Sequence, residues 1–118
     1  WLVNSIVSPS GRVTYRGTSQ TIRQVISPVA AHQLGSMMED VVREGTGTAA
    51  ALTGIDVAGK SGTADTPSGN QCWFIAFAPA KNPKVAIAVT LESQPSGATG
   101  GVVAAPIAAR VIEALLRQ

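Results

Sequence analysis

The chain has 118 residues, of which 45% are hydrophobic and only 14% are charged, with a formal net charge of +2. Because roughly a quarter of the residues in a typical soluble domain are charged, we expect much of this surface to be buried, and we interpret the chain as part of a larger protein. The Lys and Arg residues are scattered rather than clustered, which argues against a nucleic-acid partner. A single cysteine, Cys72, excludes an internal disulfide.

The first third of the chain predicts short β segments followed by a helix. Residues 2–21 have β character, and "SPSGR" (8–12) predicts a turn within them. Ser27 is a candidate helix cap, with Pro28 in the first helical position. Gly45 is expected to end this helix with a positive φ. Apolar residues recur at helical spacing and should be buried: Ala30, Leu34, Met37 or Met38, and Val41.

The rest of the chain predicts three strands and a second helix. The first strand is expected from Ile55 to Lys60. The apolar runs "QCWFIAFA" (71–78) and "VAIAVTLE" (85–92) predict an antiparallel hairpin with both sheet faces covered. A helix is expected over about 102–117, with an i,i+4 pair between Glu113 and Arg117. Its buried stripe is predicted as Val103, Ile107, Val111 and Leu115, with Ala104, Ala105, Ala108 and Ala109 allowing a close approach to the sheet.

The stretch "GIDVAGKSGTAD" (54–65) fits two different anion-binding patterns. Its first part matches the nucleotide-binding pattern G-x-x-x-x-G-K-[ST], whereas Lys60, Ser61 and Gly62 match the K-[ST]-G pattern of enzymes that acylate an active-site serine. A phosphate-binding loop must follow a strand and run into a helix. Before Gly54 stands "GTGTAAALT", which is no strand, and the glycines and proline after Ser61 oppose a helix. We therefore reject the nucleotide interpretation.

The K-[ST]-G interpretation gives each residue a physical use at a strand that lines a cleft. Lys60 supplies a positive charge for an anionic group, and Ser61 and Thr63 supply hydroxyl donors to the same anion. Gly62 lets a ligand approach the backbone, and a backbone N–H at this strand can join an oxyanion hole. Judged on Lys60 to Thr63 alone, this functional interpretation has an equally good structural alternative. In that alternative, an edge strand simply ends in a solvated lysine and a glycine turn.

Other candidate residues are interpreted as structural. His32, on the polar side of the first helix, has the character of a surface histidine, and Cys72 that of a packed side chain. Trp73 and Phe74 are expected in strand packing, and Ser68-Gly69-Asn70 in a turn. No metal ligands cluster in the sequence, so we expect no metal and no cofactor.

The order of motifs carries a more specific resemblance. "REGTGTAA", "VAGKSGTAD", "CWFIAFAPAKNP" and the final "AAPIAARVIEALL" follow one another along the chain. This order resembles the C-terminal part of the transpeptidase domain of class B penicillin-binding proteins, of the actinobacterial penicillin-binding protein A type. The resemblance covers nearly the whole chain. It implies that residues 1–118 are the C-terminal portion of such a domain, with an α+β fold in which helices flank an antiparallel sheet; this chain would give about three strands and two main helices.

The resemblance also implies an activity. Members of the family are serine D,D-transpeptidases that cross-link peptidoglycan through an acyl-enzyme and bind β-lactams. By position, Lys60 and Thr63 would be catalytic, and Ser61, Gly62 and Thr63 would bind substrate. The hydroxyls of Ser61 and Thr63 would bind the carboxylate of the donor peptide or the antibiotic, and the Thr63 N–H would be half of the oxyanion hole. The family nucleophile lies in Ser-x-x-Lys, and no serine here has a lysine three positions later, so this chain alone is expected to be inactive.

Expected partners are the peptidoglycan stem peptide, β-lactam antibiotics, the upstream residues of the same domain, and cell-division or elongation proteins. The location implied is the extracytoplasmic face of the cell membrane, with an anchor outside this chain. Two alternatives remain at this stage. One is a serine β-lactamase or D,D-carboxypeptidase, which shares the K-[ST]-G strand, and the other is a non-catalytic module with the same fold.

Overall fold

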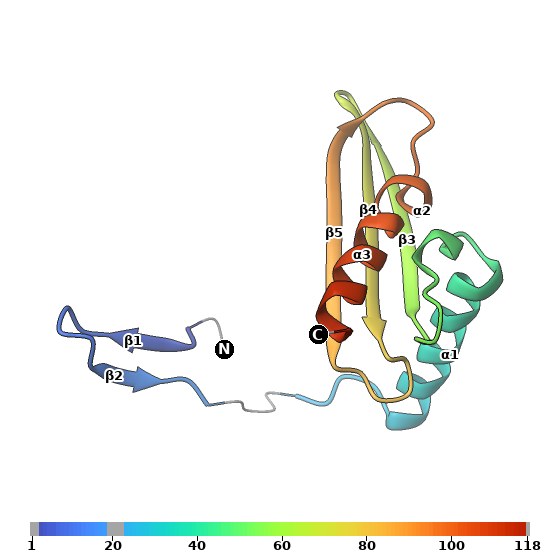
Figure 1. The fold of residues 1–118 in the computed structure, drawn as a ribbon. Helices are drawn as coiled ribbons and strands as arrows, with labels where there is room; N and C mark the ends of the chain where they lie inside the picture. The colour runs from blue at the N-terminus through green and yellow to red at the C-terminus, as the bar shows by residue number, and fades with distance from the viewer. Residues whose placement is uncertain (1–2, 19–22, 118) are drawn as a thin grey trace.

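The computed structural model describes residues 3–18 and 23–117, and it combines helices with antiparallel sheets. Figure 1 shows the arrangement of the elements. In chain order they are β1 (Ser5–Val7), β2 (Val13–Arg16), α1 (Pro28–Glu44), the 3-10 turn η1 (Thr48–Ala50), β3 (Ala58–Thr66), β4 (Gly69–Ala78), β5 (Val85–Gln94), α2 (Gly100–Val103) and α3 (Ala105–Leu116). The predicted α+β class is confirmed.

The strands β1 and β2 form an antiparallel hairpin around the predicted turn. Ile6 pairs with Tyr15, and the Gly11 N–H donates to the Ser8 carbonyl at 2.9 Å. Gly11 has a φ of +80°, which a glycine adopts without strain. Every residue of the two strands is exposed. The ends of the predicted β segment, Leu2 and residues 19–21, lie outside the described residues.

Helix α1 begins as predicted but ends differently. The Ser27 hydroxyl accepts a hydrogen bond from the Ala30 N–H at 3.1 Å, and Pro28 occupies the first turn. At the other end Gly45 has a φ of −103°, so the predicted positive φ is wrong. Glycine is needed here for space instead, because a Cβ would lie 2.9 Å from the Val41 Cα.

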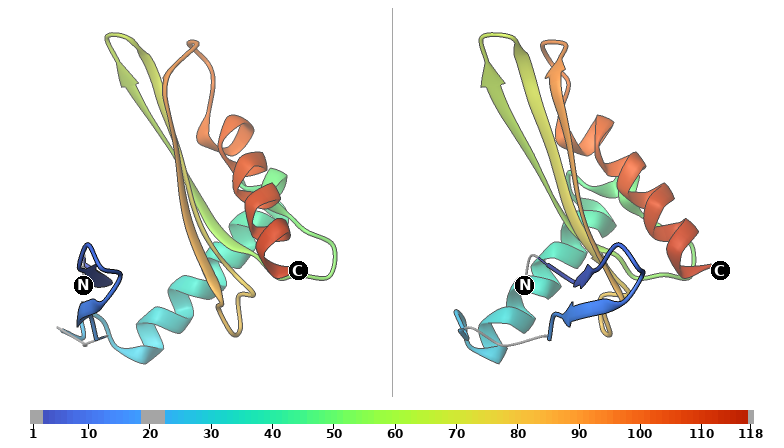
Figure 2. Two further views of the ribbon diagram at one scale, coloured as in Figure 1. Left: turned by 60° about the vertical axis from the view of Figure 1, so that its left-hand side comes forward. Right: turned by 90° about the vertical axis from the view of Figure 1, so that its left-hand side faces the viewer.

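The predicted buried stripe of α1 is also wrong. Leu34 and Met37 are 49% and 57% exposed, and the residue that α1 buries is Val42. Figure 2 explains this difference, since the first half of α1 extends away from the sheet and only its second half lies against it. Helical periodicity identifies an apolar face but cannot say how much of that face meets a neighbour.

The strands β3, β4 and β5 form one antiparallel sheet in that order. The strand β3 begins at Ala58 rather than Ile55 and continues through Lys60 to Thr66, so the motif lies within a strand and not at its end. A two-residue turn joins β3 to β4, with Thr66 paired to Gly69. Of the predicted turn residues 68–70, only Ser68 lies in this turn, because Gly69, with a φ of +115°, and Asn70 already belong to β4.

Burial alternates along β4, so only one face of the sheet is fully covered. Cys72, Phe74 and Ala76 are buried, whereas Trp73 and Ile75 are 40% and 47% exposed. In Figure 2 the sheet lies between α1 on one side and α3 on the other. Because α1 covers only part of its face, the expectation that both faces are covered is wrong for the described residues.

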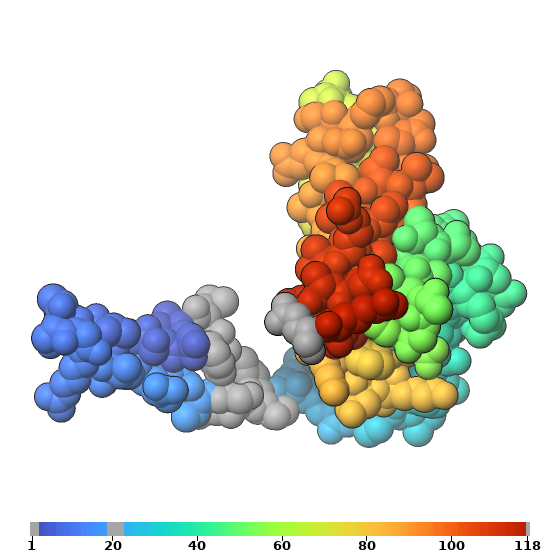
Figure 3. Space-filling model, in the orientation of Figure 1, coloured from blue at the N-terminus to red at the C-terminus, as the bar shows by residue number. Residues whose placement is uncertain are grey.

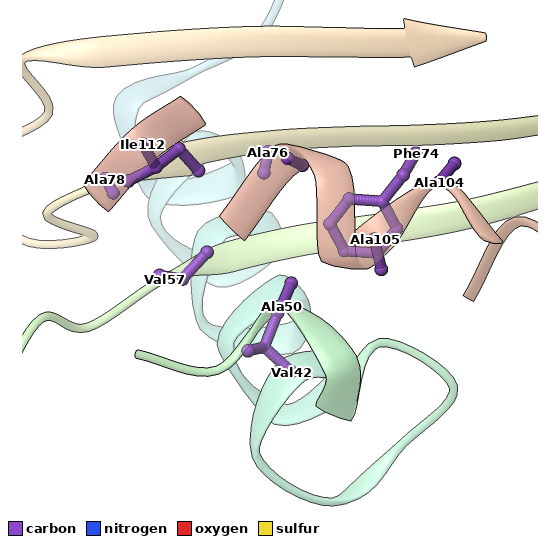
Figure 4. Packing of buried hydrophobic residues seen from close by; sticks show 10 residues of the cluster. Val42, Ala50, Val57, Phe74, Ala76, Ala78, Ala104, Ala105 and Ile112 are labelled. Atoms are coloured by element: carbon purple, nitrogen blue, oxygen red, sulfur yellow. The ribbon is translucent and has the colours of Figure 1, made fainter. Parts of the chain in front are cut away.

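The predicted final helix is divided at Ala104 into α2 and α3, and Pro106 lies in the first turn of α3, where it is tolerated. The predicted stripe is wrong, since Ile107, Val111 and Leu115 are 41%, 39% and 50% exposed. The residues that face the sheet are Ala104, Ala105, Ala108, Ala109 and Ile112. Figure 4 shows Ala104, Ala105 and Ile112 over Phe74, Ala76 and Ala78 of β4. The prediction that alanines allow a close approach is confirmed.

The C-terminal end of α3 is held by its charged residues. The predicted pair forms, with Arg117 Nη1 3.3 Å from Glu113 Oε1, and Arg117 also donates to the Thr53 carbonyl at 3.0 Å. Figure 3 shows the surface of α3 (red) against the segment between α1 and β3 (green). Among residues 3–18 and 23–117, no helix is long and apolar enough to cross a bilayer.

Candidate functional site

The strand β3 is an edge strand of the described sheet, and its side chains alternate between the two faces. Ser61 pairs with Phe74 and Thr63 with Cys72, so these hydroxyls lie on the face covered by α2 and α3. Lys60 pairs with Ile75, on the face that carries α1. From the sequence we expected the side chains of Lys60, Ser61 and Thr63 to surround one anion. In the structure the Lys60 side chain instead leaves the strand on the face opposite to the two hydroxyls.

The backbone of β3 presents alternate residues to its open edge. A Cβ added to Gly100 would lie 2.4 Å from the Gly62 carbonyl and 2.0 Å from the Trp73 carbonyl, so both oxygens lie between β3 and β4. Opposed residues whose carbonyls meet in this way form a hydrogen-bonded pair, and the residues on either side then point their N–H and C=O groups outward. The N–H of Thr63 and the C=O of Ser61 therefore face the open edge.

The ammonium of Lys60 reaches that same edge. Its Nζ donates to the Ser61 carbonyl at 2.7 Å, so the side chain bends from its own face of the sheet towards the strand edge. The stem of Lys60 lines an apolar groove of about 380 Å³, together with Leu34, Met37, Met38, Val41 and Ile75. A cation and an outward backbone N–H thus lie along one short stretch of edge.

The Thr63 hydroxyl is oriented by the start of α2. The Gly100 N–H donates to Thr63 Oγ1 at 3.1 Å. Because a hydroxyl carries one proton and accepts through its lone pairs, this contact leaves the Thr63 proton free to be donated elsewhere. Thr63 is itself exposed, so that proton can be offered to a ligand.

The Ser61 hydroxyl has a partner that sequence analysis missed. Thr46 Oγ1, in the loop after α1, lies 2.8 Å from Ser61 Oγ. Gly101 is packed against this loop, because a Cβ there would be 2.0 Å from the Thr46 carbonyl. Thr46 is 15 positions from Ser61 in the chain, and no periodicity links them. The sequence signal for this contact is the pair of glycines at 100 and 101, where the structure leaves no room for a side chain.

The structure confirms that Lys60 does not lie in a phosphate-binding loop. Gly59 is inside β3, where a Cβ would be 2.6 Å from the Phe74 ring. After Ser61 the chain remains extended to Thr66, so no helix begins beside the lysine. The chain that follows the lysine therefore does not supply the helix N-terminus that such a loop needs.

The remaining candidates lie in structural positions. His32 is exposed on α1, and Cys72 is fully buried with its Sγ 3.4 Å from the Ala98 carbonyl. In the described part of the chain, no three His, Cys, Asp or Glu residues come together as metal ligands would. A second hollow of about 200 Å³ lies between α1 and the segment before β3, lined by Glu39, Arg43 and Asp56 among others, and it contains no residue of the motif.

Comparison with known proteins identifies the family. The family model described as "Penicillin binding protein transpeptidase domain" matches residues 1–113. The chain belongs to the penicillin-binding protein transpeptidase family. The resemblance seen in the sequence is therefore confirmed.

Two curated relatives illustrate the membership in this transpeptidase family. The peptidoglycan D,D-transpeptidase PbpA of Mycolicibacterium smegmatis is 37% identical over all of this chain, which corresponds to 25% of that protein. The probable peptidoglycan D,D-transpeptidase PenA of Neisseria gonorrhoeae is 39% identical over 71% of this chain and 16% of that protein. The chain thus spans about a quarter or less of the length of these relatives.

Solved structures of penicillin-binding proteins share the fold. Penicillin-binding protein A of M. tuberculosis, as a ceftriaxone acyl-enzyme complex, matches with a TM-score of 0.84 and 36% identity over 98% of this chain and 27% of that one. The D,D-transpeptidase domain of a peptidoglycan glycosyltransferase from Eggerthella lenta matches with a TM-score of 0.78 and 37% identity over 95% of this chain and 26% of that one. The predicted fold is therefore confirmed.

Proposed function

We propose that this chain is the C-terminal part of the catalytic domain of a peptidoglycan D,D-transpeptidase that also binds β-lactams. The observation that carries the proposal is the open edge of β3, which combines the outward N–H of Thr63 with the Lys60 ammonium and two hydroxyls. Support comes from relatives named D,D-transpeptidases that align with the whole chain. The full-length protein consists of this chain together with the rest of the domain.

The substrate carboxylate is the anion that this edge would bind. The terminal carboxylate of a donor stem peptide, or that of a β-lactam, would accept hydrogen bonds from the Ser61 and Thr63 hydroxyls, while Gly62 lets the ligand lie close to the strand. Hydrogen bonds to an ionised group are each worth about 1.5–3 kcal/mol. Lys60 adds a positive charge at the same edge and favours the deprotonated form of a nearby hydroxyl.

The backbone N–H of Thr63 would act at the next step, when a serine oxygen bonds to the substrate carbonyl carbon. The carbonyl oxygen then becomes an oxyanion, and a donor that is already in place stabilises it. Collapse of this intermediate breaks the C–N bond and transfers the serine proton to the leaving amine. None of the serines in the 118 residues lies in Ser-x-x-Lys, so the nucleophile and its lysine base belong to the rest of the protein.

The cellular setting follows from this assignment. A peptidoglycan transpeptidase works at the extracytoplasmic face of the cell membrane, and its anchor would be a segment outside this chain. Its partners would be the stem peptide, the remainder of the transpeptidase domain, and proteins of cell division or elongation.

The direct test is Lys60→Ala in the full-length protein. We expect acylation by a fluorescent penicillin to slow by about 100-fold or more, because a charged group beside the reacting atoms is lost. Lys81→Ala is the matched control, since Lys81 is exposed in the turn between β4 and β5. Labelling of Lys60→Ala at the rate of the unmodified protein would remove this residue from the mechanism.

The same protein also distinguishes a transpeptidase from its hydrolytic relatives. A transpeptidase should open the ring of a single equivalent of a chromogenic cephalosporin and then stop, because its acyl-enzyme is long-lived. Sustained turnover would favour a β-lactamase or D,D-carboxypeptidase. A lack of labelling with intact folding would favour a non-catalytic module.

A further inference from the structure

The contact between Thr46 and Ser61 joins two segments that are far apart in the sequence. Thr46 is exposed in the loop after α1, and Ser61 is half-buried on β3. Their hydroxyl oxygens are 2.8 Å apart, a normal distance for an O–H···O hydrogen bond, and either atom can be the donor.

The loop that carries Thr46 is held from two sides. The N–H groups of Gly45 and Gly47 both donate to the Val41 carbonyl, at 3.1 and 3.0 Å, so the loop is fixed to the end of α1. On the other side the Gly101 backbone packs so closely that a Cβ would be 2.0 Å from the Thr46 carbonyl. Thr46 is therefore located by elements that themselves contact the sheet, and it does not depend on its contact with Ser61 for its position.

The direction of the shared proton follows from the chemistry of hydroxyl groups. A hydroxyl has one proton to donate, and a carboxylate can only accept. When Ser61 donates to a bound carboxylate, its oxygen can receive a hydrogen bond from Thr46 but cannot donate to Thr46. The Thr46 hydroxyl then occupies a lone pair of Ser61 and holds the Ser61 proton towards the ligand.

We propose that Thr46 is a positioning residue for the Ser61 hydroxyl and thereby strengthens binding of the substrate carboxylate. This inference rests on the proposed function, because it assigns an anionic ligand to Ser61. The inference gives the loop after α1 a role in ligand binding that the K-[ST]-G motif alone does not imply.

The test is a double-mutant cycle in the full-length protein. Thr46→Val keeps the shape of the side chain but removes the hydroxyl, Thr46→Ser keeps the hydroxyl, and Ser61→Ala removes the group that Thr46 positions. The rate of acylation by a fluorescent penicillin is measured against its concentration, which separates the apparent dissociation constant from the limiting rate. Thermal unfolding of each variant monitors the fold.

We expect Thr46→Val to raise the apparent dissociation constant by about three- to ten-fold, the value of one ordinary hydrogen bond. The limiting rate should change little, because the carboxylate is bound both before and during the reaction. Thr46→Ser should behave like the unmodified protein. In the Ser61→Ala background, Thr46→Val should have less than about a two-fold further effect.

The outcomes separate this inference from the proposed function. If Ser61→Ala leaves acylation unchanged, the carboxylate-binding role of Ser61 fails and the inference fails with it. If Ser61→Ala slows acylation but Thr46→Val does not, only the inference is wrong. An equal effect of Thr46→Val in both backgrounds would show a general role of the loop and would also overturn it. Should Thr46→Val not fold, Thr46→Ala takes its place in the same cycle.

Discussion

Gly62 lies on the same face of β3 as Lys60, and the described structure has room for a larger residue there. A Cβ at this position would be 3.5 Å from the Trp73 Cβ, an ordinary contact. The glycine is therefore not required by packing, in contrast to Gly59, where a Cβ would be 2.6 Å from the Phe74 ring. Under the proposed function, the glycine would instead serve the ligand that lies against the strand at this position.

This difference makes Gly62→Ala a test of function without loss of stability. We expect the free energy of unfolding of the full-length protein to change by less than about 0.5 kcal/mol. Acylation by penicillin should slow by about 10- to 100-fold, because a methyl group displaces the ligand from its reactive position. Gly59→Ala is the contrasting variant and should destabilise the protein. Unchanged acylation by Gly62→Ala would mean that no ligand passes over this residue.

At the scale of single elements, the open edge of β3 decides which backbone groups are free. Thr63 and Asp65 both point their N–H groups outward, since they alternate with Gly62, whose carbonyl lies between the strands. Proline is tolerated on an edge strand where the N–H faces outward. Substituting proline at these two positions therefore removes an outward N–H while keeping the sheet.

We expect Thr63→Pro to slow acylation by about 10²- to 10³-fold relative to Thr63→Val, because it removes one oxyanion donor in addition to the hydroxyl. Asp65→Pro is the matched control and should be labelled at close to the normal rate. The measurement is the rate of acylation of the full-length variants by a fluorescent penicillin. Equal rates for Thr63→Pro and Thr63→Val would exclude a role for this N–H.

The helix α3 shows why periodicity alone chose the wrong face. Valine, isoleucine and leucine mark one side of the helix, but the side that meets the sheet is made of alanines and Ile112, which is fully buried. Because the alanine side chains are small, the helix backbone lies close to β4. This face is therefore more completely buried than its low hydrophobicity suggests. The small volume of the alanine side chains, which matches the surface of β4, therefore determines which face of α3 packs against the sheet.

Ile112→Ala and Val111→Ala compare these two faces directly. We expect Ile112→Ala to lower the free energy of unfolding by about 2–5 kcal/mol, since it leaves a cavity in a packed core. Val111 is 39% exposed, and Val111→Ala should cost less than about 1 kcal/mol. Chemical denaturation of the full-length protein measures both. A larger cost for Val111→Ala would restore the stripe predicted from periodicity.

At the scale of the whole molecule, features encoded by neighbouring residues were predictable and those set by distant contacts were not. The Ser27 cap, the hairpin turn at 8–12 and the strand pair β4–β5 follow from local chemistry, and all are found. The length of β3 could not be predicted, because pairing with β4 extends the strand beyond Lys60, where its predicted range ended, to Thr66. The partnership of Thr46 with Ser61 was equally invisible, because it depends on how α2 packs against a distant loop.

Under the proposed function the catalytic site is divided between this chain and the rest of the protein, which gives a prediction for the chain by itself. The 118-residue chain should form no covalent adduct with a fluorescent penicillin, because it contains no Ser-x-x-Lys. The full-length protein is the positive control and should be labelled at one site. Gel fluorescence after denaturation distinguishes the two. A covalent label on the isolated chain would place a nucleophile within it.

The close approach of Gly101 to the loop of Thr46 has a consequence for how such a sequence can change. Three stretches of chain, around positions 46, 61 and 101, meet where there is no space for one extra carbon atom. A side chain at position 101 therefore has to be matched by a shift of the loop that carries Thr46. Variants selected for altered antibiotic sensitivity should therefore carry compensating changes across these stretches, and a mutant library that diversifies one stretch at a time would miss them.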